Sequence, residues 1–388
     1  MSSVGARAAA LPAAKNPLKK TRSTAAGQRR AALGEITNCP EAAANAKRTG
    51  ATKASAKPKP ATVQPAAAPL VPLQAAADRL PSVSEEVADA STEEEELCQE
   101  FSEKLLAIED VDEHDADQPY LCSHYVKEIY KYLQDLEVQQ AVRADYMRGY
   151  EITPQMRALL VDWLVQVHSR FQLLQETLYV TVAILDRFLQ VQPVSRRKLQ
   201  LVGVTAMLLA CKFEEMYAPE VGDFAYITDN AFTKLQIVKM EQLVLRSLHF
   251  QLGRPVPLHF LRRASKVANS DVQRHMLAKY LMELTLLDYS MVHYRPSEVA
   301  AASLCLSQLL LHGLPWSPTQ QHYSTYDEAH LRPIMQHIAK NVVAVNEERT
   351  KFQAVKKKYS RVELMKISLL PELSSSIVRN MAAAVSSS

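Results

Sequence analysis

The chain has 388 residues, of which 47% are hydrophobic and 22% are charged, so it is long enough to bury one or two sizeable cores. Its five cysteines are scattered without a C-x-x-C pair, which argues against a disulfide framework and favours reduced thiols. Charges interrupt every apolar run before about 18 residues, and the first twenty residues lack the apolar core of a secretory signal. We therefore expect a soluble intracellular protein without membrane insertion.

The N-terminal 118 residues are predicted to form a disordered regulatory tail. Residues 1–80 contain 13 Lys/Arg against 3 Asp/Glu, with 24 Ala and no aromatic residue, so they lack the side chains needed to build a core. Residues 81–118 reverse the sign and contain 1 Lys against 15 Asp/Glu, including an acidic run from Glu93 to Glu96. The remainder is only mildly basic, so nucleic acid is an unlikely partner.

From Tyr120 onward the sequence shows helical periodicity and few strand signals, which predicts an all-α body. Glycine is sparse there, and prolines divide the body into segments of helical length, enough for roughly ten helices. We place the breaks between helices at Pro154, Pro193, Pro219, Pro255, Pro296, Pro315 and Pro333.

Two halves of this body resemble each other weakly. LYVTVAILDRF (178–188) precedes the Ala-containing apolar run VGVTAMLLACK (202–212), and LAKYLMELTLLDYS (277–290) precedes VAAASLCLSQLLL (299–311). In each half an amphipathic helix is followed by an almost uniformly apolar one, which is typical of a central helix surrounded by neighbours. The pattern predicts two similar helical bundles that meet near residues 253–255.

Sequence motifs for catalysis are missing. The chain contains no G-x-G-x-x-G, G-x-x-x-x-G-K-[ST], H-E-x-x-H or G-x-S-x-G pattern, and its eleven histidines are dispersed. We therefore expect a non-catalytic binding protein without a cofactor or a metal.

The stretch MRALLVDWLVQVH (156–168) is apolar around most of its circumference. Met156, Trp163 and Val167 follow one helical stripe, while Leu160 and Leu164 follow an adjoining one. Such a helix is either central to a bundle or binds a partner.

This stretch is the first of several that together closely resemble the cyclin family. The others are LDRFL (185–189), KLQLVGVTAMLLACKFEE (198–215), YITDNAF (226–232), KMEQLVLRSLHF (239–250), FLRRASK (260–266) and LAKYLMELTLLDY (277–289). FLRRASK and the last stretch look specifically B-type, meaning mitotic. The resemblance implies two five-helix cyclin folds in tandem, at 119–252 and 253–370, followed by a short C-terminal tail at 371–388.

The resemblance assigns a docking patch for Arg-x-Leu peptides of substrates and inhibitors to the first helix of the first fold and to two residues near it. Its residues in this chain are Met156, Leu159, Leu160, Trp163, Gln166, Leu199 and Gln200. Periodicity alone would favour core positions for the apolar members, whereas exposed Trp, Met and Leu side chains suit peptide docking. Many family members have an acidic residue at the position of Gln166, so Arg selection is expected to be weaker here.

The resemblance also implies an ion pair and a kinase-binding face. Arg157 and Asp186 match charged positions that meet inside the fold, so we expect a structural ion pair whose loss unfolds the repeat. Lys212 and Glu241 match positions that face a cyclin-dependent kinase. Flanking positions on that face are Phe213, Glu214 and Glu215. The alternative for Lys212 and Glu241 is a pair of ordinary surface charges.

A phosphate pocket is a further expectation from the B-type resemblance. His275 and Lys279 lie four residues apart on one predicted helix, and Arg262 lies in the preceding FLRRASK segment. A solvated basic face explains the three cations about equally well. The run from Arg262 to Ser265 also fits a basophilic kinase site, although a serine on a packed helix is often unreachable.

The tail contains RAALGEITN (30–38), in which Arg30, Leu33, Ile36 and Asn38 have the spacing of a destruction box. Such a degron is an extended peptide that a mitotic ubiquitin ligase reads, so it requires a disordered segment. Several nearby lysines are candidate acceptors of ubiquitin. The motif predicts a protein with a regulated, periodic lifetime.

Together these features predict the activating subunit of a mitotic cyclin-dependent kinase, acting as a heterodimer at the G2/M transition and degraded at mitotic exit. A cyclin-fold transcription factor or scaffold that binds DNA is the alternative, and strong salt-dependent DNA binding would distinguish it. A third class, an enzyme, is disfavoured by the missing motifs. Without a dense Lys/Arg run, the expected location is the cytoplasm, with nuclear entry at mitosis dependent on partners.

Overall fold

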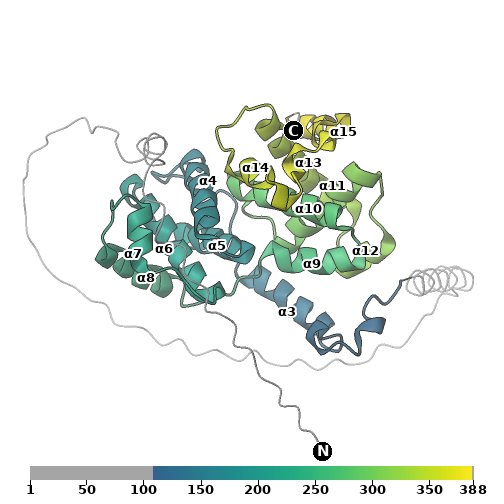
Figure 1. The fold of residues 1–388 in the computed structure, drawn as a ribbon, viewed down its shortest axis with the longest axis horizontal. Coiled ribbons are helices and arrows are strands. Elements are labelled where there is room, and N and C mark those ends of the chain that lie inside the picture. Colours follow the sequence, from purple (N-terminus) through teal and green to yellow (C-terminus); the bar gives the residue numbers. More distant parts are fainter. Residues whose placement is uncertain (1–107, 387–388) are drawn as a thin grey trace, which may run out of the picture. The chain divides into compact units, whose positions relative to one another are not determined.

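The computed structural model describes residues 108–386, and within this range every regular element is a helix. After two short 3-10 turns and α3 (Val126–Gln139), the chain forms two successive groups of five α-helices (Figure 1). The first group is α4 (Pro154–Phe171), α5 (Gln175–Val191), α6 (Arg196–Glu214), α7 (Val221–Ile227) and α8 (Lys234–Ser247). The second group is α9 (Pro257–Val267), α10 (Val272–Leu284), α11 (Pro296–His312), α12 (Pro318–Ser324) and α13 (Glu328–Asn346). The expected all-α fold of two tandem five-helix units is confirmed.

Each group is built around one nearly uniformly buried helix. In the first group α6 is buried continuously from Leu199 to Cys211 and packs against α4, α5 and α8. In the second group α11 is buried along most of its length and packs against α9, α10 and α13. These are the two apolar runs that the internal sequence echo predicts as central helices, and a helix apolar on all sides is stable only when neighbours surround it.

Helix α4 begins at a strong local signal. Thr153 is the N-cap and its hydroxyl accepts a hydrogen bond from the N–H of Met156, while Pro154 occupies the first helical position. The helix ends at Gln172, whose backbone is left-handed (φ 58°).

The surroundings of α4 explain why its apolar residues cover so much of its circumference. One side packs on α5 and α6 of its own group. Another side packs on two 3-10 turns of the second group, η4 (Thr285–Leu287) and η5 (Tyr289–Met291), and on α14 (Ala354–Tyr359), which lies beside it in Figure 1. The helix is therefore central to the molecule, because both groups bury it.

The C-terminal end of the described chain is part of the fold, which corrects the expectation of a short tail at 371–388. After α14 the chain forms the 3-10 turns η6 (Val362–Leu364), η7 (Ile367–Leu369) and η8 (Pro371–Ser374), and then α15 (Ser376–Ser386). Helix α15 packs against α13 and buries Val378 and Ala382. The sequence did not predict this helix, because its apolar stripe is only two turns long.

The folded part also begins earlier than the expected boundary after residue 118. The carboxylate of Asp112 pairs with Arg263 of α9 through two contacts of 2.5 Å and accepts a third from Lys266 at 2.8 Å. Asp115 also pairs with Lys266. Composition alone predicts that this acidic stretch belongs to the tail, but its charges are complementary to the basic face of α9.

Pro333 lies inside α13 rather than at a break between helices. The helix starts earlier, where the Asp327 side chain accepts a hydrogen bond from the N–H of His330 at 2.7 Å. Pro333 removes one backbone hydrogen bond in the second turn. Burial of Leu331 and Ile334 on either side compensates for that loss.

Candidate partner-binding sites

Arg157 and Asp186 are brought together in the core. The Arg157 guanidinium donates to both carboxylate oxygens of Asp186, at 2.6 and 2.7 Å, and only 1% of Arg157 is exposed. Arg157 also donates to the carbonyl of Leu286 at 2.9 Å, and the Tyr146 hydroxyl donates to Asp186 at 2.8 Å. Although burial lowers the pKa of Arg157, the neighbouring Asp186 raises it further, so the guanidinium stays charged. Every member of this buried cluster is hydrogen-bonded, and the Leu286 contact links the two helical groups.

Three of the proposed docking-patch residues are accessible on one helix. Met156, Leu159 and Trp163 of α4 are each partly buried, and their spacing of three and four residues places them on one face. Gln166 is exposed beside them and donates to Asp162 at 3.2 Å. A surface of this kind combines a large aromatic anchor with adaptable apolar side chains.

The predicted patch is too large, because three of its residues, Leu160, Leu199 and Gln200, are buried. Leu160 and Leu199 have no exposed surface and belong to the core, and Gln200 is also buried. Leu160 packs against Gly203 of α6 so closely that a Cβ atom there would lie 2.8 Å from its Cδ1. The prediction grouped Leu160 with the exposed residues of α4, whereas its side chain faces α6.

Lys212 and Glu241 form an ion pair at the end of α6. The Lys212 Nζ lies 2.6 Å from Oε1 of Glu241 on α8, and the two side chains are 48% and 11% exposed. Phe213 is exposed beside them. Met216 and Tyr217, in the loop after α6, are 86% and 87% exposed. Periodicity gave no reason to single out these last two, because they lie outside any helix; two adjacent large apolar residues in a loop would have been the available signal.

The two glutamates in this segment differ in role. Glu215 accepts hydrogen bonds from the N–H of Leu174 at 2.7 Å and from the hydroxyl of Thr177 at 2.5 Å, so its carboxylate fixes the start of α5. Glu214 has no such contacts within the described chain, and burial, followed by the nearby Glu176, raises its pKa. Glu215 therefore has a structural role, and its place on the kinase-binding face stays a prediction.

Arg262, His275 and Lys279 lie close enough for their charges to interact. Burial lowers the pKa of His275, and Lys279 and Arg262 lower it further. Burial also lowers the pKa of Lys279. The guanidinium of Arg262 is paired with Glu176 of α5, and Nδ1 of His275 lies 2.8 Å from the hydroxyl of Ser265. The structure thus adds an anion, Glu176, that sequence reasoning missed.

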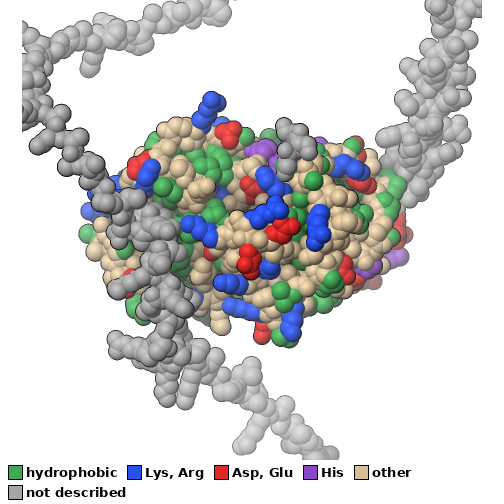
Figure 2. Space-filling model, turned by 90° about the horizontal axis from the view of Figure 1, so that it is seen from above, with side chains coloured by type: hydrophobic (Ala, Val, Ile, Leu, Met, Phe, Trp, Pro, Cys, Tyr) green, Lys and Arg blue, Asp and Glu red, His purple; other side chains and the backbone are tan. Residues whose placement is uncertain are grey.

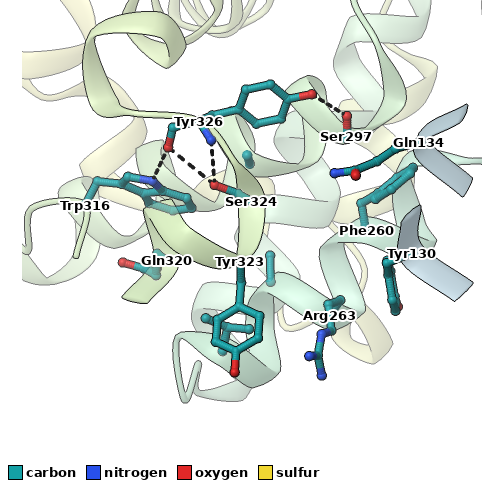
Figure 3. Close-up of a pocket in the computed structure, with 13 residues that line it drawn as sticks. Tyr130, Gln134, Phe260, Arg263, Ser297, Trp316, Gln320, Tyr323, Ser324 and Tyr326 are labelled. Atoms are coloured by element: carbon teal, nitrogen blue, oxygen red, sulfur yellow. Dashed lines mark hydrogen bonds between the residues drawn. The ribbon is translucent and has the colours of Figure 1, made fainter. Parts of the chain in front are cut away.

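An aromatic pocket of about 40 Å³ lies where α3 meets the second group (Figure 3). The Tyr130 hydroxyl of α3 donates to the carbonyl of His259 at 3.0 Å, and its ring meets that of Phe260 edge-on, with centroids 6.0 Å apart. The guanidinium of Arg263 lies over the rings of Tyr130 and Tyr323, at 5.8 and 5.1 Å. These contacts, with the ion pair to Asp112, anchor α3 and the residues before it to α9.

Other classes of site receive little support from the described residues. Within 108–386 no three His, Cys, Asp or Glu side chains gather as metal ligands would. None of the helices in that range combines the length and the hydropathy needed to cross a bilayer. The face drawn in Figure 2 carries acidic and basic side chains interspersed. A mixed surface of this kind does not favour binding to the phosphates of nucleic acid.

Comparison with known proteins assigns the family. Residues 128–253 match the model of the cyclin N-terminal domain, and residues 255–373 match that of the cyclin C-terminal domain. The chain belongs to the cyclin family. It is 69% identical to the G2/mitotic-specific cyclin-B2 of Oryzias latipes, over 99% of both chains, and 54% identical to that of Homo sapiens, over 91% of both chains. The crystal structure of a viral cyclin from herpesvirus saimiri is 18% identical, with a TM-score of 0.48, and covers 54% of this chain and 97% of its own.

These matches confirm the B-type mitotic resemblance that FLRRASK and the following helix suggested. The two matched domains meet at residues 253 to 255, the predicted boundary between the two halves. The destruction box, comprising Arg30, Leu33, Ile36 and Asn38, lies outside the described residues and stays a prediction from sequence.

Proposed function

We propose that this cyclin is the activating subunit of a mitotic cyclin-dependent Ser/Thr kinase and acts with it as a heterodimer at the G2/M transition. The relatives at high identity are named G2/mitotic-specific cyclins, and the match extends over nearly the whole chain. The observation that carries the proposal is the exposed face formed by Lys212, Phe213, Met216, Tyr217 and Glu241, which we call the kinase face.

The kinase face has the composition of a protein interface. Large apolar side chains so fully exposed mark interaction sites, and aromatic anchors supply most of the binding energy in such interfaces. The Lys212–Glu241 pair lies beside them with most of the glutamate shielded. A partner that covers this pair would desolvate it, so the charges would fix the register of docking.

Activation by this mechanism needs no catalytic residue in the cyclin. A protein kinase is active when its αC helix places a glutamate against the β3 lysine and when its activation loop is ordered. Binding to the active arrangement shifts the kinase towards it, and a shift from 1:99 to 99:1 requires about 5.5 kcal/mol of differential affinity. A large helical interface can provide that difference. Phosphoryl transfer is assigned entirely to the kinase.

The docking patch for Arg-x-Leu peptides is proposed in a smaller form than the sequence suggested. Met156, Leu159 and Trp163 supply the apolar surface, and Gln166 stands beside them. Because Gln166 has an amide in place of a carboxylate, the patch would bind the apolar part of the peptide and select weakly for Arg. Substrates and inhibitors with such peptides are the proposed ligands.

The cluster of Arg262, His275 and Lys279 is proposed to bind a phosphorylated partner. Lys279 is half-buried and forms no hydrogen bond or ion pair with the described residues, so it retains its full capacity for an anion. Arg262 must first release Glu176. The proposed affinity is therefore set by competition between a phosphate and this carboxylate.

Destruction by a mitotic ubiquitin ligase is proposed from the tail motif alone. Arg30, Leu33, Ile36 and Asn38 supply the recognition element, and lysines close to it would accept ubiquitin. Residence in the cytoplasm with nuclear entry at mitosis is proposed because the tail lacks a dense Lys/Arg run.

Binding of a mitotic cyclin-dependent kinase tests the proposal, with calorimetry as the readout. Tyr217→Ala and Lys212→Ala should each raise Kd at least about 30-fold, the effect of losing an interface anchor worth roughly 2 kcal/mol. Arg332→Ala, which removes an exposed ion pair with Glu328 on α13, serves as the control and should leave Kd unchanged. Equal affinity of all four proteins for the kinase would contradict the proposed face.

A further inference from the structure

The side chain of Arg254 lies in a cavity between the two cyclin folds without a partner. It forms no hydrogen bond or ion pair with residues 108–386, and its Nε atom is shielded from solvent. The cavity has a volume of about 70 Å³ and is lined by both folds and by the linker that joins them. Its walls include Arg157, Tyr179, Asp186, Pro255, Met291 and Tyr294.

Both carboxylates near Arg254 already have partners. Asp186 accepts two hydrogen bonds from Arg157. Glu137 of α3, which is 1% exposed, accepts from the N–H and the hydroxyl of Ser297. Neither carboxylate therefore serves Arg254 as a dedicated counter-ion.

The region between the two cyclin folds, which we call the seam, contains an excess of positive charge. Arg187 lies near Arg254 and donates only to a neutral group, the carbonyl of Gln251, at 2.6 Å. The guanidinium groups of Arg157, Arg187 and Arg254 are thus accompanied by only two carboxylates, those of Asp186 and Glu137. Burial, together with the charge of Arg254, lowers the pKa of Arg187 to about 10, and burial lowers the pKa of Arg254 as well. A largely buried guanidinium without a dedicated counter-ion is costly unless an anion accompanies it.

The size of the cavity fits a small anion. A single water needs roughly 10–15 Å³ of such volume, so a cavity of about 70 Å³ has room for an oxyanion with a few waters. A guanidinium pairs with carboxylate or phosphate oxygens through two parallel hydrogen bonds. We propose that the seam cavity is a binding site for one oxyanion, held by Arg254 between the two cyclin folds.

Two sources can supply this chemistry, namely a free phosphate and an acidic side chain of the kinase subunit. In either case the anion would neutralise the linker cation and so stabilise the arrangement of the folds around it. Arg254→Met tests the role of the charge, because methionine keeps the apolar length of the arginine side chain and removes its charge. Arg254→Lys keeps the charge and removes the two-pronged geometry.

The first experiment measures the Tm of the isolated chain against inorganic phosphate, with sodium chloride holding the ionic strength constant. Phosphate at tenfold Kd should raise the Tm by about 3 °C. Arg254→Met should lower that rise to the part contributed by the cluster of Arg262, His275 and Lys279, and Arg254→Lys should lower it less. Arg332→Met, which removes an exposed cation of α13, should keep the wild-type rise.

The second experiment measures the Kd for the kinase subunit without phosphate. If an acidic side chain of the kinase fills the cavity, Arg254→Met weakens binding about tenfold, Arg332→Met does not, and phosphate competes with the kinase. If free phosphate is the ligand, Arg254→Met changes the phosphate dependence of the Tm and leaves the Kd for the kinase unchanged. The proposal is overturned if wild type and Arg254→Met show the same phosphate dependence and the same Kd, because the cavity then holds water only.

Discussion

The carboxylate of Asp162 on α4 accepts a hydrogen bond from the backbone N–H of Ala354, 192 residues later in the chain, at 2.9 Å. Ala354 is the first residue of α14, so a side chain of the first cyclin fold caps a helix that follows the second. Asp162 is almost fully buried, and burial raises its pKa, which the Ala354 contact opposes. Together with the Arg157 contact to Leu286, this bond makes α4 one of the polar links between the two halves as well as their shared apolar surface.

Asp162→Ala is expected to lower the free energy of unfolding by about 1–3 kcal/mol, because it leaves a buried N–H without an acceptor. Asp162→Asn keeps an acceptor oxygen at the same place and should cost clearly less. Urea unfolding followed by circular dichroism measures both. An equal loss in the two variants would show that the capping bond does not contribute.

Removal of one partner of the buried Arg157–Asp186 pair should cost about 3–5 kcal/mol, because the other charge stays buried. Arg157→Met and Asp186→Leu are therefore each expected to unfold at much lower urea concentrations. The double variant should be more stable than either single variant. Additive losses in the double variant would contradict the description of this pair as a coupled unit.

Asp112 provides a prediction for the dependence of stability on pH. The hydrogen bond from Arg263 lowers the pKa of Asp112 from 3.8 to about 2. Because the folded pKa is the lower one, the stabilisation is complete above the unfolded value of 3.8 and is lost as the pH falls towards 2. The shift corresponds to about 2 kcal/mol.

Asp112→Asn should accordingly be less stable than wild type at pH 6, with a difference that shrinks between pH 4 and pH 2. Urea unfolding across this range measures the difference. Glu363→Gln, which replaces an exposed carboxylate in η6, is the control and should match wild type at each pH. A constant difference between Asp112→Asn and wild type would contradict the ion pair with Arg263.

Glu176→Gln tests the phosphate cluster. The variant removes the negative charge that occupies Arg262, so affinity for a phosphorylated peptide should rise several-fold. Lys279→Met should lower the affinity, and the unphosphorylated peptide should bind neither protein. Fluorescence anisotropy provides the measurement. If Glu176→Gln left phosphopeptide binding unchanged while Lys279→Met abolished it, the competition with Glu176 would be wrong.

The sequence predicted what depends on repeated local pattern. Helical periodicity and proline positions predicted roughly ten helices, the internal echo predicted two bundles with α6 and α11 as central helices, and the cyclin resemblance implied five helices in each bundle. The circumference of apolar residues on α4 indicated either burial on several sides or a binding role. The structure shows burial on several sides, with Leu160 turned towards α6, while Trp163 is partly accessible and its binding role stays a prediction.

Features that depend on distant residues escaped prediction for a physical reason. Asp162 and Glu176 look like ordinary helix-surface acids until α14 and α9 are placed beside them. Asp112 belongs by composition to an acidic tail, and only the position of Arg263 makes it part of the fold. Glu215 lies within the motif that resembles a kinase-binding segment, yet its hydrogen bonds to the start of α5 are tertiary contacts.

The central claim is activation of a kinase through the kinase face, and the rate of histone phosphorylation tests it most directly. A mitotic cyclin-dependent kinase would be assayed with increasing amounts of the wild-type chain, of Lys212→Ala/Tyr217→Ala, and of the control Arg332→Ala. We predict that wild type and the control raise the rate to the same plateau, whereas the double variant requires far more protein to reach it. If the folded wild-type chain left the rate of histone phosphorylation unchanged at saturating concentration, the proposed function would be contradicted.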